Sequence, residues 1–217
     1  MGLFWIGVFV ARTLGRKTSF SLAPIGFILP KSGTLKGISF GLAVGIGAAV
    51  VGALLNAVST VVFESLGYSA DSRAQQPFMQ ALESLVQDNP ALAIPAIVFA
   101  VVIFGPFVEE LVFRAAIFNG LYRLARLVPA SILGKEVTRS ADLISFAAAA
   151  LASSGFFALL HLDPILLPTL ITLAVALCAL FRWSGSLLPS FVAHATFNSF
   201  ATTLIILSGL GVFNLPV

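Results

Sequence analysis

Long apolar runs separated by short polar segments dominate the chain. Residues 37–63 carry no charged side chain and are rich in glycine, alanine and valine, which suits close packing between membrane helices. Further uncharged runs occupy residues 89–108, 143–161, 165–181 and 186–210. A transmembrane helix needs about 20 predominantly apolar residues, so most of these runs are long enough to predict a membrane span.

The second of these runs is too long for one ordinary span. Its apolar pattern continues past several charged residues as far as Leu127. A straight helix over residues 91–127 would be roughly 55 Å long at about 1.5 Å per residue, nearly twice the hydrocarbon thickness of a bilayer. The segment is therefore expected to kink, turn back or emerge from the membrane at Gly105 and Pro106.

Two arguments disagree about this point of the chain. With a continuous second span, the basic residues up to Lys36, those between residues 123 and 139, and Arg182 all face the cytoplasm, as the positive-inside rule prefers. That arrangement places Glu109 and His161 near opposite faces of the membrane. Since catalysis needs groups within hydrogen-bond reach, we expect the chain to reverse at residues 105–106, or to form a strongly tilted, partly re-entrant pair of helices.

Polar segments define the rest of the fold. Residues 70–90 predict an extramembrane loop with room for a short surface helix, and residues 128–142 predict a second loop. Residues 3–11 are too few to span a bilayer and have basic residues after them rather than before, which predicts an interfacial helix and no cleaved targeting peptide. The expected fold is an all-α polytopic bundle of five or six transmembrane helices in a single membrane domain, residues 1–217.

Composition supports an integral, multi-pass membrane protein. Hydrophobic residues make up 59% of the 217 residues and charged residues 10%, against roughly 45–50% and 25% in soluble domains. The net charge of +3 comes from 12 basic side chains that sit mostly in short loops, which excludes a nucleic-acid-binding surface. Cys178 is the one cysteine, so neither a disulfide nor a thiolate metal cluster forms within a single chain.

Ionisable side chains within the apolar runs are the main functional signal. Such a group costs at least ~2.5–3.5 kcal/mol on insertion scales and persists only with a partner or a task. A single buried histidine is often a hydrogen-bonded packing residue, but a set of five ionisable groups favours a site. The five are Glu109, Glu110, Arg114, His161 and His194.

The spacing of these groups separates structural from chemical roles. Glu110 and Arg114 are four residues apart, so they can form an ion pair that offsets the burial of both. Glu109 is rotated about 100° from Glu110 around the helix, which leaves its carboxylate available to water or a metal. His194 and Asn198 also lie one turn apart and can together stabilise an oxyanion, serve as metal ligands, or join helices by hydrogen bonds.

Motifs of other intramembrane enzymes are missing. The sequence has no HExxH zinc helix, no GxGD pair of an aspartyl protease and no GxSG serine motif. Ser153, Ser154 and Ser186 are possible nucleophiles, but none lies in a recognisable nucleophile elbow.

Three segments between residues 105 and 198 together resemble one family. The stretch from Pro106 to Arg114 is similar to the EExxxR motif, residues 157–161 (FALLH) to the FxxxH motif, and residues 194–198 (HATFN) to the HxxxN motif of the CPBP family, also called the type II CAAX prenyl endopeptidase or Abi family of intramembrane proteases. Ala115 stands where many members have glycine. Residues 1–90 carry no such resemblance.

This resemblance implies roles for the matching residues. Glu109 would polarise the attacking water with His161 beside it, while His194 and Asn198 would stabilise the oxyanion. Glu110 and Arg114 would hold the site together, and Phe157 would line the same face as His161.

Metal dependence is a separate question for this family, because its members are often called metalloproteases although hydrolysis without a metal has also been argued. If a divalent ion such as zinc is bound, Glu109, His161 and His194 are the expected ligands. We instead predict a metal-free site in which these three side chains and Asn198 surround a water-accessible pocket.

Several functions are compatible with the sequence. The favoured one is an endopeptidase that cuts a membrane-associated polypeptide, prenylated or not, within or beside the lipid bilayer. The alternative is a non-proteolytic membrane partner or immunity-type factor with the same fold. A proton-coupled transporter using Glu109 and His161 as a relay lacks the paired broken helices or inverted repeat that would support it.

Overall fold

The computed structural model describes residues 23–68, 75–133 and 138–213, with side chains from residues 128–133 left out. It has no strand in these ranges. The helix predicted at residues 3–11 lies outside them. Among the described residues, five helices are long and apolar enough to cross a membrane, which confirms the all-α polytopic fold.

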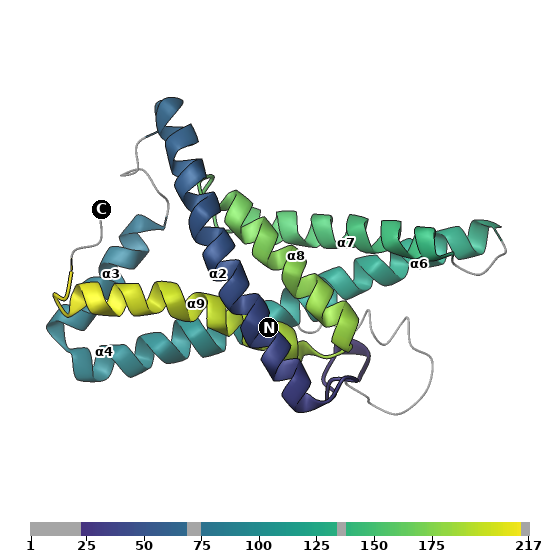
Figure 1. The fold of residues 1–217 in the computed structure, drawn as a ribbon, viewed down its shortest axis with the longest axis horizontal. Helices are drawn as coiled ribbons and strands as arrows, with labels where there is room; N and C mark the ends of the chain where they lie inside the picture. The colour runs from purple at the N-terminus through teal and green to yellow at the C-terminus, as the bar shows by residue number, and fades with distance from the viewer. Residues whose placement is uncertain (1–22, 69–74, 134–137, 214–217) are drawn as a thin grey trace.

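The spanning helices follow the predicted apolar runs (Figure 1). Helix α2 begins at Thr34 after a short 3₁₀ turn and ends at Ser65, and α8 is joined to α9 by a tight turn in which Gly185 adopts φ 67°. Ser186 caps α9, because its side-chain oxygen accepts a hydrogen bond from the backbone N–H of Leu188. The elements are η1 Ala23–Ile25, α2 Thr34–Ser65, α3 Gln76–Asp88, α4 Pro90–Ile97, α5 Gly105–Glu110, α6 Asn119–Leu133, α7 Arg139–Leu159, α8 Leu167–Ser184 and α9 Leu187–Gly209.

The predicted reversal at residues 105–106 is wrong. Residues 90–127 form one continuous helix, in which the π-helical stretches Val98–Phe104 and Leu111–Phe118 flank α5. Gly105 keeps helical angles, φ −56° and ψ −60°, and its N–H bonds to the carbonyl of Ala100, five residues back. A proline ring clashes with the carbonyl four residues before it, and the wider π turn accommodates Pro106 without breaking the helix.

The predicted loop at residues 128–142 is also too long. Helix α6 continues to Leu133 and α7 begins at Arg139, where the side chain of Thr138 accepts a hydrogen bond from the N–H of Ala141. Apolar residues beyond Leu127 extend the helical pattern, and the capping threonine starts the next helix early. The surface helix predicted within residues 70–90 is present as α3.

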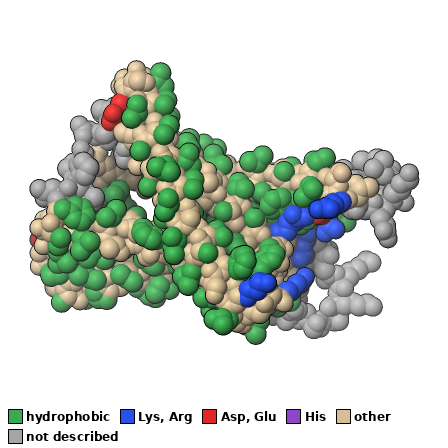
Figure 2. Space-filling view, viewed as in Figure 1, with side chains coloured by type: hydrophobic (Ala, Val, Ile, Leu, Met, Phe, Trp, Pro, Cys, Tyr) green, Lys and Arg blue, Asp and Glu red, His purple; other side chains and the backbone are tan. Residues whose placement is uncertain are grey.

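Basic residues gather at one end of the molecule (Figure 2). Arg123 donates to the carbonyl of Pro24, and Arg182 and Arg126 both pair with Asp142. The continuous helix therefore satisfies the positive-inside preference that a reversal would have violated.

Small residues determine how the helices approach one another. Helix α2 crosses α9 on a glycine face: a Cβ built on Gly41 would lie 2.7 Å from the carbonyl oxygen of Pro189, and one on Gly45 would lie 2.6 Å from that of Ala193. Such close backbone approach is typical of membrane helix pairs.

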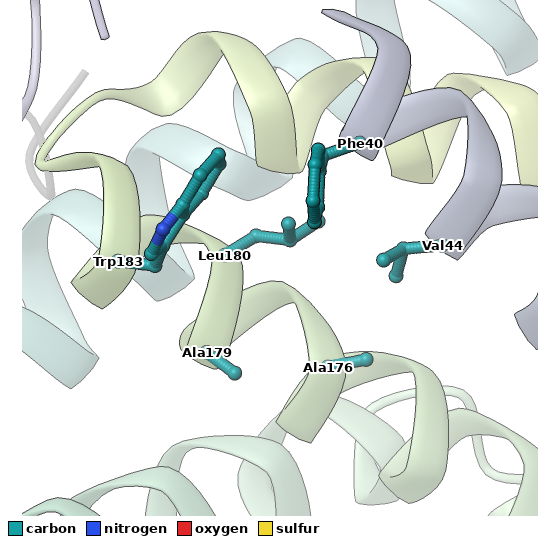
Figure 3. Close-up of a pocket in the computed structure, with 6 residues that line it drawn as sticks. All are labelled: Phe40, Val44, Ala176, Ala179, Leu180 and Trp183. Atoms are coloured by element: carbon teal, nitrogen blue, oxygen red, sulfur yellow. The ribbon is translucent and has the colours of Figure 1, made fainter. Parts of the chain in front are cut away.

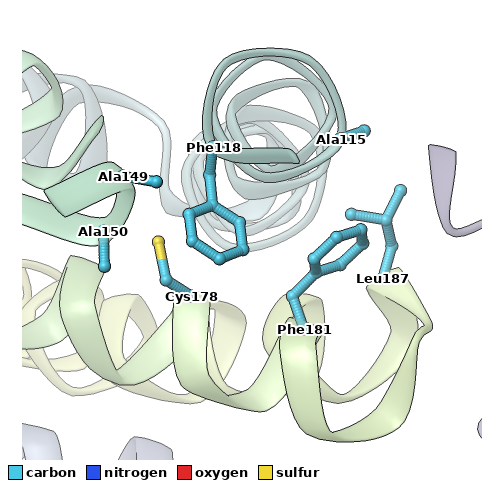
Figure 4. Packing of buried hydrophobic residues seen from close by; sticks show 7 residues of the cluster. All are labelled: Ala115, Phe118, Ala149, Ala150, Cys178, Phe181 and Leu187. Atoms are coloured by element: carbon cyan, nitrogen blue, oxygen red, sulfur yellow. The ribbon is translucent and has the colours of Figure 1, made fainter. Parts of the chain in front are cut away.

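A cluster of buried apolar side chains packs the long helix against α7, α8 and the start of α9 (Figure 4). In it, the ring of Phe118 packs edge-on against Phe181 at 6.2 Å. The cluster begins one residue after Arg114, so it holds the motif-bearing part of the long helix in place. Its members are Ala115, Phe118, Ala149, Ala150, Cys178, Phe181 and Leu187.

Candidate active site

The two motif glutamates occupy very different environments at the end of α5. The side chain of Glu110 is 1% exposed, whereas that of Glu109 is 36% exposed. Consecutive helical residues point about 100° apart, and here one direction leads into the protein and the other toward open space. Glu109 alone can receive a water molecule or substrate from outside.

The predicted ion pair joins the end of α5 to the π-helical stretch that follows. Arg114 Nε lies 3.3 Å from Glu110 Oε1, and both side chains are fully buried. The guanidinium also lies over the ring of Phe157, 5.0 Å from its centroid. Since isolated charges are very costly away from water, each of the two groups depends on the other for its burial.

His194 joins both glutamates to α9. Its Nδ1 is 3.0 Å from Glu110 Oε1 and its Nε2 is 3.4 Å from Glu109 Oε2. Because Glu110 is paired with Arg114 as a carboxylate, Nδ1 carries the hydrogen and donates it. Nε2 is therefore the nitrogen that faces the accessible carboxylate.

The contact between these two atoms can carry a hydrogen bond. His194 Nε2 and Glu109 Oε2 face each other at 3.4 Å, so a hydrogen placed on either atom can be accepted by the other.

In the described part of the chain, His161 is connected to the other site residues only by way of Phe157, whose ring contacts both histidines. It lies in the turn after α7, with Nδ1 2.9 Å from the carbonyl oxygen of Phe157. A carbonyl only accepts, so Nδ1 carries the hydrogen and Nε2 keeps a lone pair when the ring is neutral. The ring centroid of Phe157 is 4.7 Å from that of His161 and 5.8 Å from that of His194. Within the described residues no hydrogen bond joins His161 to Glu109, and Phe157 stands between the two histidines.

Asn198 joins two helices by a hydrogen bond, which is one of the roles that the sequence analysis left open for it. Its Nδ2 donates to the carbonyl of Val101, at 3.0 Å, in the first π-helical stretch. In the register of Gly105 and Ala100, residue 106 would bond this carbonyl, but Pro106 has no N–H. Asn198 thus supplies the donor that the proline lacks, and one of its two N–H groups is left for other partners.

The three candidate serine nucleophiles are either hydrogen-bonded to backbone carbonyls or fully buried. Ser153 donates to the carbonyl of Phe113, 3.2 Å away in the second π-helical stretch, and Ser186 donates to the carbonyl of Ile28 while capping α9. Ser154 is 1% exposed. These positions offer no base next to an accessible hydroxyl.

Asp163 is a site-supporting residue that the sequence analysis missed. It is 1% exposed, and its Oδ1 accepts the N–H groups of Ile165 and Leu166 at 3.0 and 3.3 Å. This arrangement shapes the turn that carries His161 into α8. The Asp-Pro pair at residues 163–164, a common turn signal, could have revealed it.

The candidate metal ligands are only partly assembled. His194 Nε2 and Glu109 Oε2 have a spacing of 3.4 Å, about the edge of a tetrahedral zinc site with ligands at roughly 2.1 Å. Within residues 23–68, 75–133 and 138–213, however, no three His, Cys, Asp or Glu side chains come together as a metal-binding group. These residues as arranged do not fit a three-ligand zinc site.

One comparison with known proteins matches the part of the chain that contains these residues. A family model described as type II CAAX prenyl endopeptidase Rce1-like matches residues 90–200, slightly more than half of the chain. The matched region contains all seven residues that the sequence analysis assigned to the site. Searches of curated proteins and of solved structures found no match.

Proposed function

The chain belongs to the type II CAAX prenyl endopeptidase Rce1-like family of integral membrane proteases, and on this premise we propose that Glu109 activates the water that cleaves a membrane-associated polypeptide. The observation that carries this proposal is the unequal pair of glutamates on His194. Glu110 is buried and paired with Arg114, so Glu109 is the carboxylate left to accept a proton from water.

The first step is attack by water on the scissile carbonyl. As the new C–O bond forms, one water proton passes to Glu109. His161 Nε2, with its lone pair free, accepts a hydrogen bond from the same water and orients it. His161 and Glu109 are not hydrogen-bonded to each other in the structure. Substrate binding must therefore bring both side chains within reach of the same water.

The oxyanion then needs donors. His194 supplies an Nε2–H when both nitrogens of its ring carry a hydrogen, and Asn198 supplies the N–H that does not bind Val101. The intermediate collapses with cleavage of the C–N bond, and the proton that Glu109 took from the attacking water goes to the leaving amine. These steps use water and the protein's own side chains.

The test is cleavage of an internally quenched, farnesylated CAAX peptide by the purified chain in phospholipid nanodiscs. Glu109→Gln keeps the size of the side chain but removes the base, and we expect kcat/KM to fall by about 10²–10⁴-fold. Glu64→Gln, a like change at an exposed position at the end of α2, is the matched control and should leave the rate unchanged.

Two outcomes would contradict the proposal. Equal cleavage by wild type and Glu109→Gln would remove Glu109 as the base. Absence of cleavage of both the farnesylated peptide and its unprenylated counterpart by the wild type would favour the non-proteolytic partner instead.

A further inference from the structure

An apolar groove opens between α2 and α8, on side chains that the proposed catalysis does not use (Figure 3). Its volume is about 290 Å³. Both helices are membrane spans, and the rings of Phe40 and Trp183 are 47% and 42% exposed, so the groove faces lipid. Its lining residues are Phe40, Val44, Ala176, Ala179, Leu180 and Trp183.

The groove exists because α2 leans toward α9. The glycine face of α2, including Gly41 and Gly45, brings its backbone against α9. On the α8 side, Ala176 and Ala179 are too short to fill the space that remains. The lining offers no polar side-chain atom except the indole N–H of Trp183, so a peptide backbone placed there would lose hydrogen bonds, whereas a hydrocarbon chain would lose none.

One end of the groove is cationic and aromatic. The ammonium of Lys36 lies over the ring of Phe40, 5.9 Å from its centroid, and the Phe40 ring packs at 5.0 Å against Trp183. Lys31 lies at the end of α8: its backbone N–H donates to the carbonyl of Ser184, and its Nζ lies 3.8 Å from where a Cβ would stand at Gly185.

Neither lysine has a carboxylate partner in the described part of the chain. Both lie beside the end of α8 that carries Arg182, since Lys31 bonds Ser184 and Lys36 covers the ring that packs on Trp183. This is the basic end of the molecule, which the positive-inside rule assigns to the cytoplasmic leaflet. Anionic lipids are concentrated in that leaflet, and each nearby lysine attracts them. A tryptophan at this level is typical of the membrane interface.

We propose that this groove binds one anionic phospholipid, with an acyl chain against Ala176 and Ala179 and the phosphate between Lys31 and Lys36. The occupant is a resident lipid rather than the substrate, and none of its contacts involves a catalytic side chain. It fills the space between α2 and α8, and thereby stabilises their packing.

The test measures quenching of Trp183 by lipids with brominated acyl chains. The chain has two tryptophans, so Trp5→Phe leaves Trp183 as the single reporter. Brominated phosphatidylglycerol is compared with brominated phosphatidylcholine in mixed micelles at low ionic strength. The expected preference for phosphatidylglycerol is about 25-fold, from about fivefold for each of two lysines.

Variants separate the headgroup site from the groove. Replacing Lys31 and Lys36 together by glutamine should reduce the preference to near one, whereas Arg139→Gln, which removes an exposed cation at the start of α7, should preserve it. Ala179→Leu fills the groove and should weaken quenching by both lipids.

Three results would overturn the proposal. The first is equal quenching by the two lipids in the wild type, and the second is a preference that survives loss of both lysines. The third is displacement of the quencher by farnesol but not by unlabelled phosphatidylglycerol, which would identify the groove as a prenyl site.

Discussion

The hydrogen bond between Asn198 and Val101 leads to a prediction that a double-mutant cycle can decide. Pro106 deprives the Val101 carbonyl of its backbone donor, and Asn198 replaces that donor at 3.0 Å. Pro106→Ala restores an N–H at residue 106. In that background the Val101 carbonyl regains a backbone partner, so Asn198 becomes dispensable for this contact.

The size of the effect follows from the contact. Interhelical side-chain hydrogen bonds in membranes contribute about 0.6 kcal/mol and up to about 1.7 kcal/mol, and a buried carbonyl left without a partner costs about 1–3 kcal/mol. We therefore expect Asn198→Ala to lower the free energy of unfolding by about 1–2 kcal/mol. With Pro106→Ala already present, the same change should cost about 1 kcal/mol less.

The assay is SDS-driven unfolding of the purified chain in mixed micelles, followed by far-UV circular dichroism. Ser199→Ala is the matched control, because the Ser199 hydroxyl donates within its own helix, to the carbonyl of Thr196 at 2.6 Å. Its effect should be the same with or without Pro106→Ala. If Asn198→Ala and Pro106→Ala add within about 0.3–0.5 kcal/mol, the contact does not compensate for the proline and the reasoning is refuted.

Three further changes test other parts of the structure. Gly45→Ala should destabilise the protein by about 1–3 kcal/mol, because its Cβ would meet a backbone carbonyl at 2.6 Å; Gly47→Ala meets nothing within 4 Å and should be neutral in the same SDS titration, so equal losses would contradict the proposed helix contact. Arg114→Met should cost about 3–5 kcal/mol by leaving the buried Glu110 carboxylate without its arginine, and the double variant with Glu110→Leu should recover much of that loss. A double variant no more stable than Arg114→Met would argue against a coupled pair. His161→Asn keeps a donor near the Nδ1 position but lacks Nε2, so thermal stability should hold while kcat/KM falls about 10²-fold or more; full peptidase activity would remove His161 from the mechanism.

Much of the fold was predictable because each membrane span is determined by its own stretch of sequence. An apolar run must satisfy its backbone hydrogen bonds within itself, so length and hydropathy are enough to place a helix. All five predicted runs became spanning helices, and the surface helix α3 appeared within the predicted polar segment. The error at residues 105–106 arose because Gly-Pro normally marks a break, whereas a change of hydrogen-bond register absorbed it here.

Part of the candidate site was also predictable from the sequence, namely the part that lies on one helix. The pairing of Glu110 with Arg114 was predictable, because a four-residue separation on a helix determines which side chains meet. The greater availability of Glu109 followed from its rotation around the same helix. Neither statement needed knowledge of any other helix.

Contacts between helices were beyond the sequence. That His194 would bridge both glutamates, that Phe157 would separate the histidines, and that Asn198 would bind a carbonyl in the long helix all depend on how three helices cross. Those crossings are determined by glycine contacts and side-chain packing between segments far apart in the chain. The sequence by itself therefore determined the spans and the chemical groups available. The tertiary structure decided which of those groups meet in hydrogen bonds and ion pairs, because proximity across helices is a property of packing rather than of spacing along one helix.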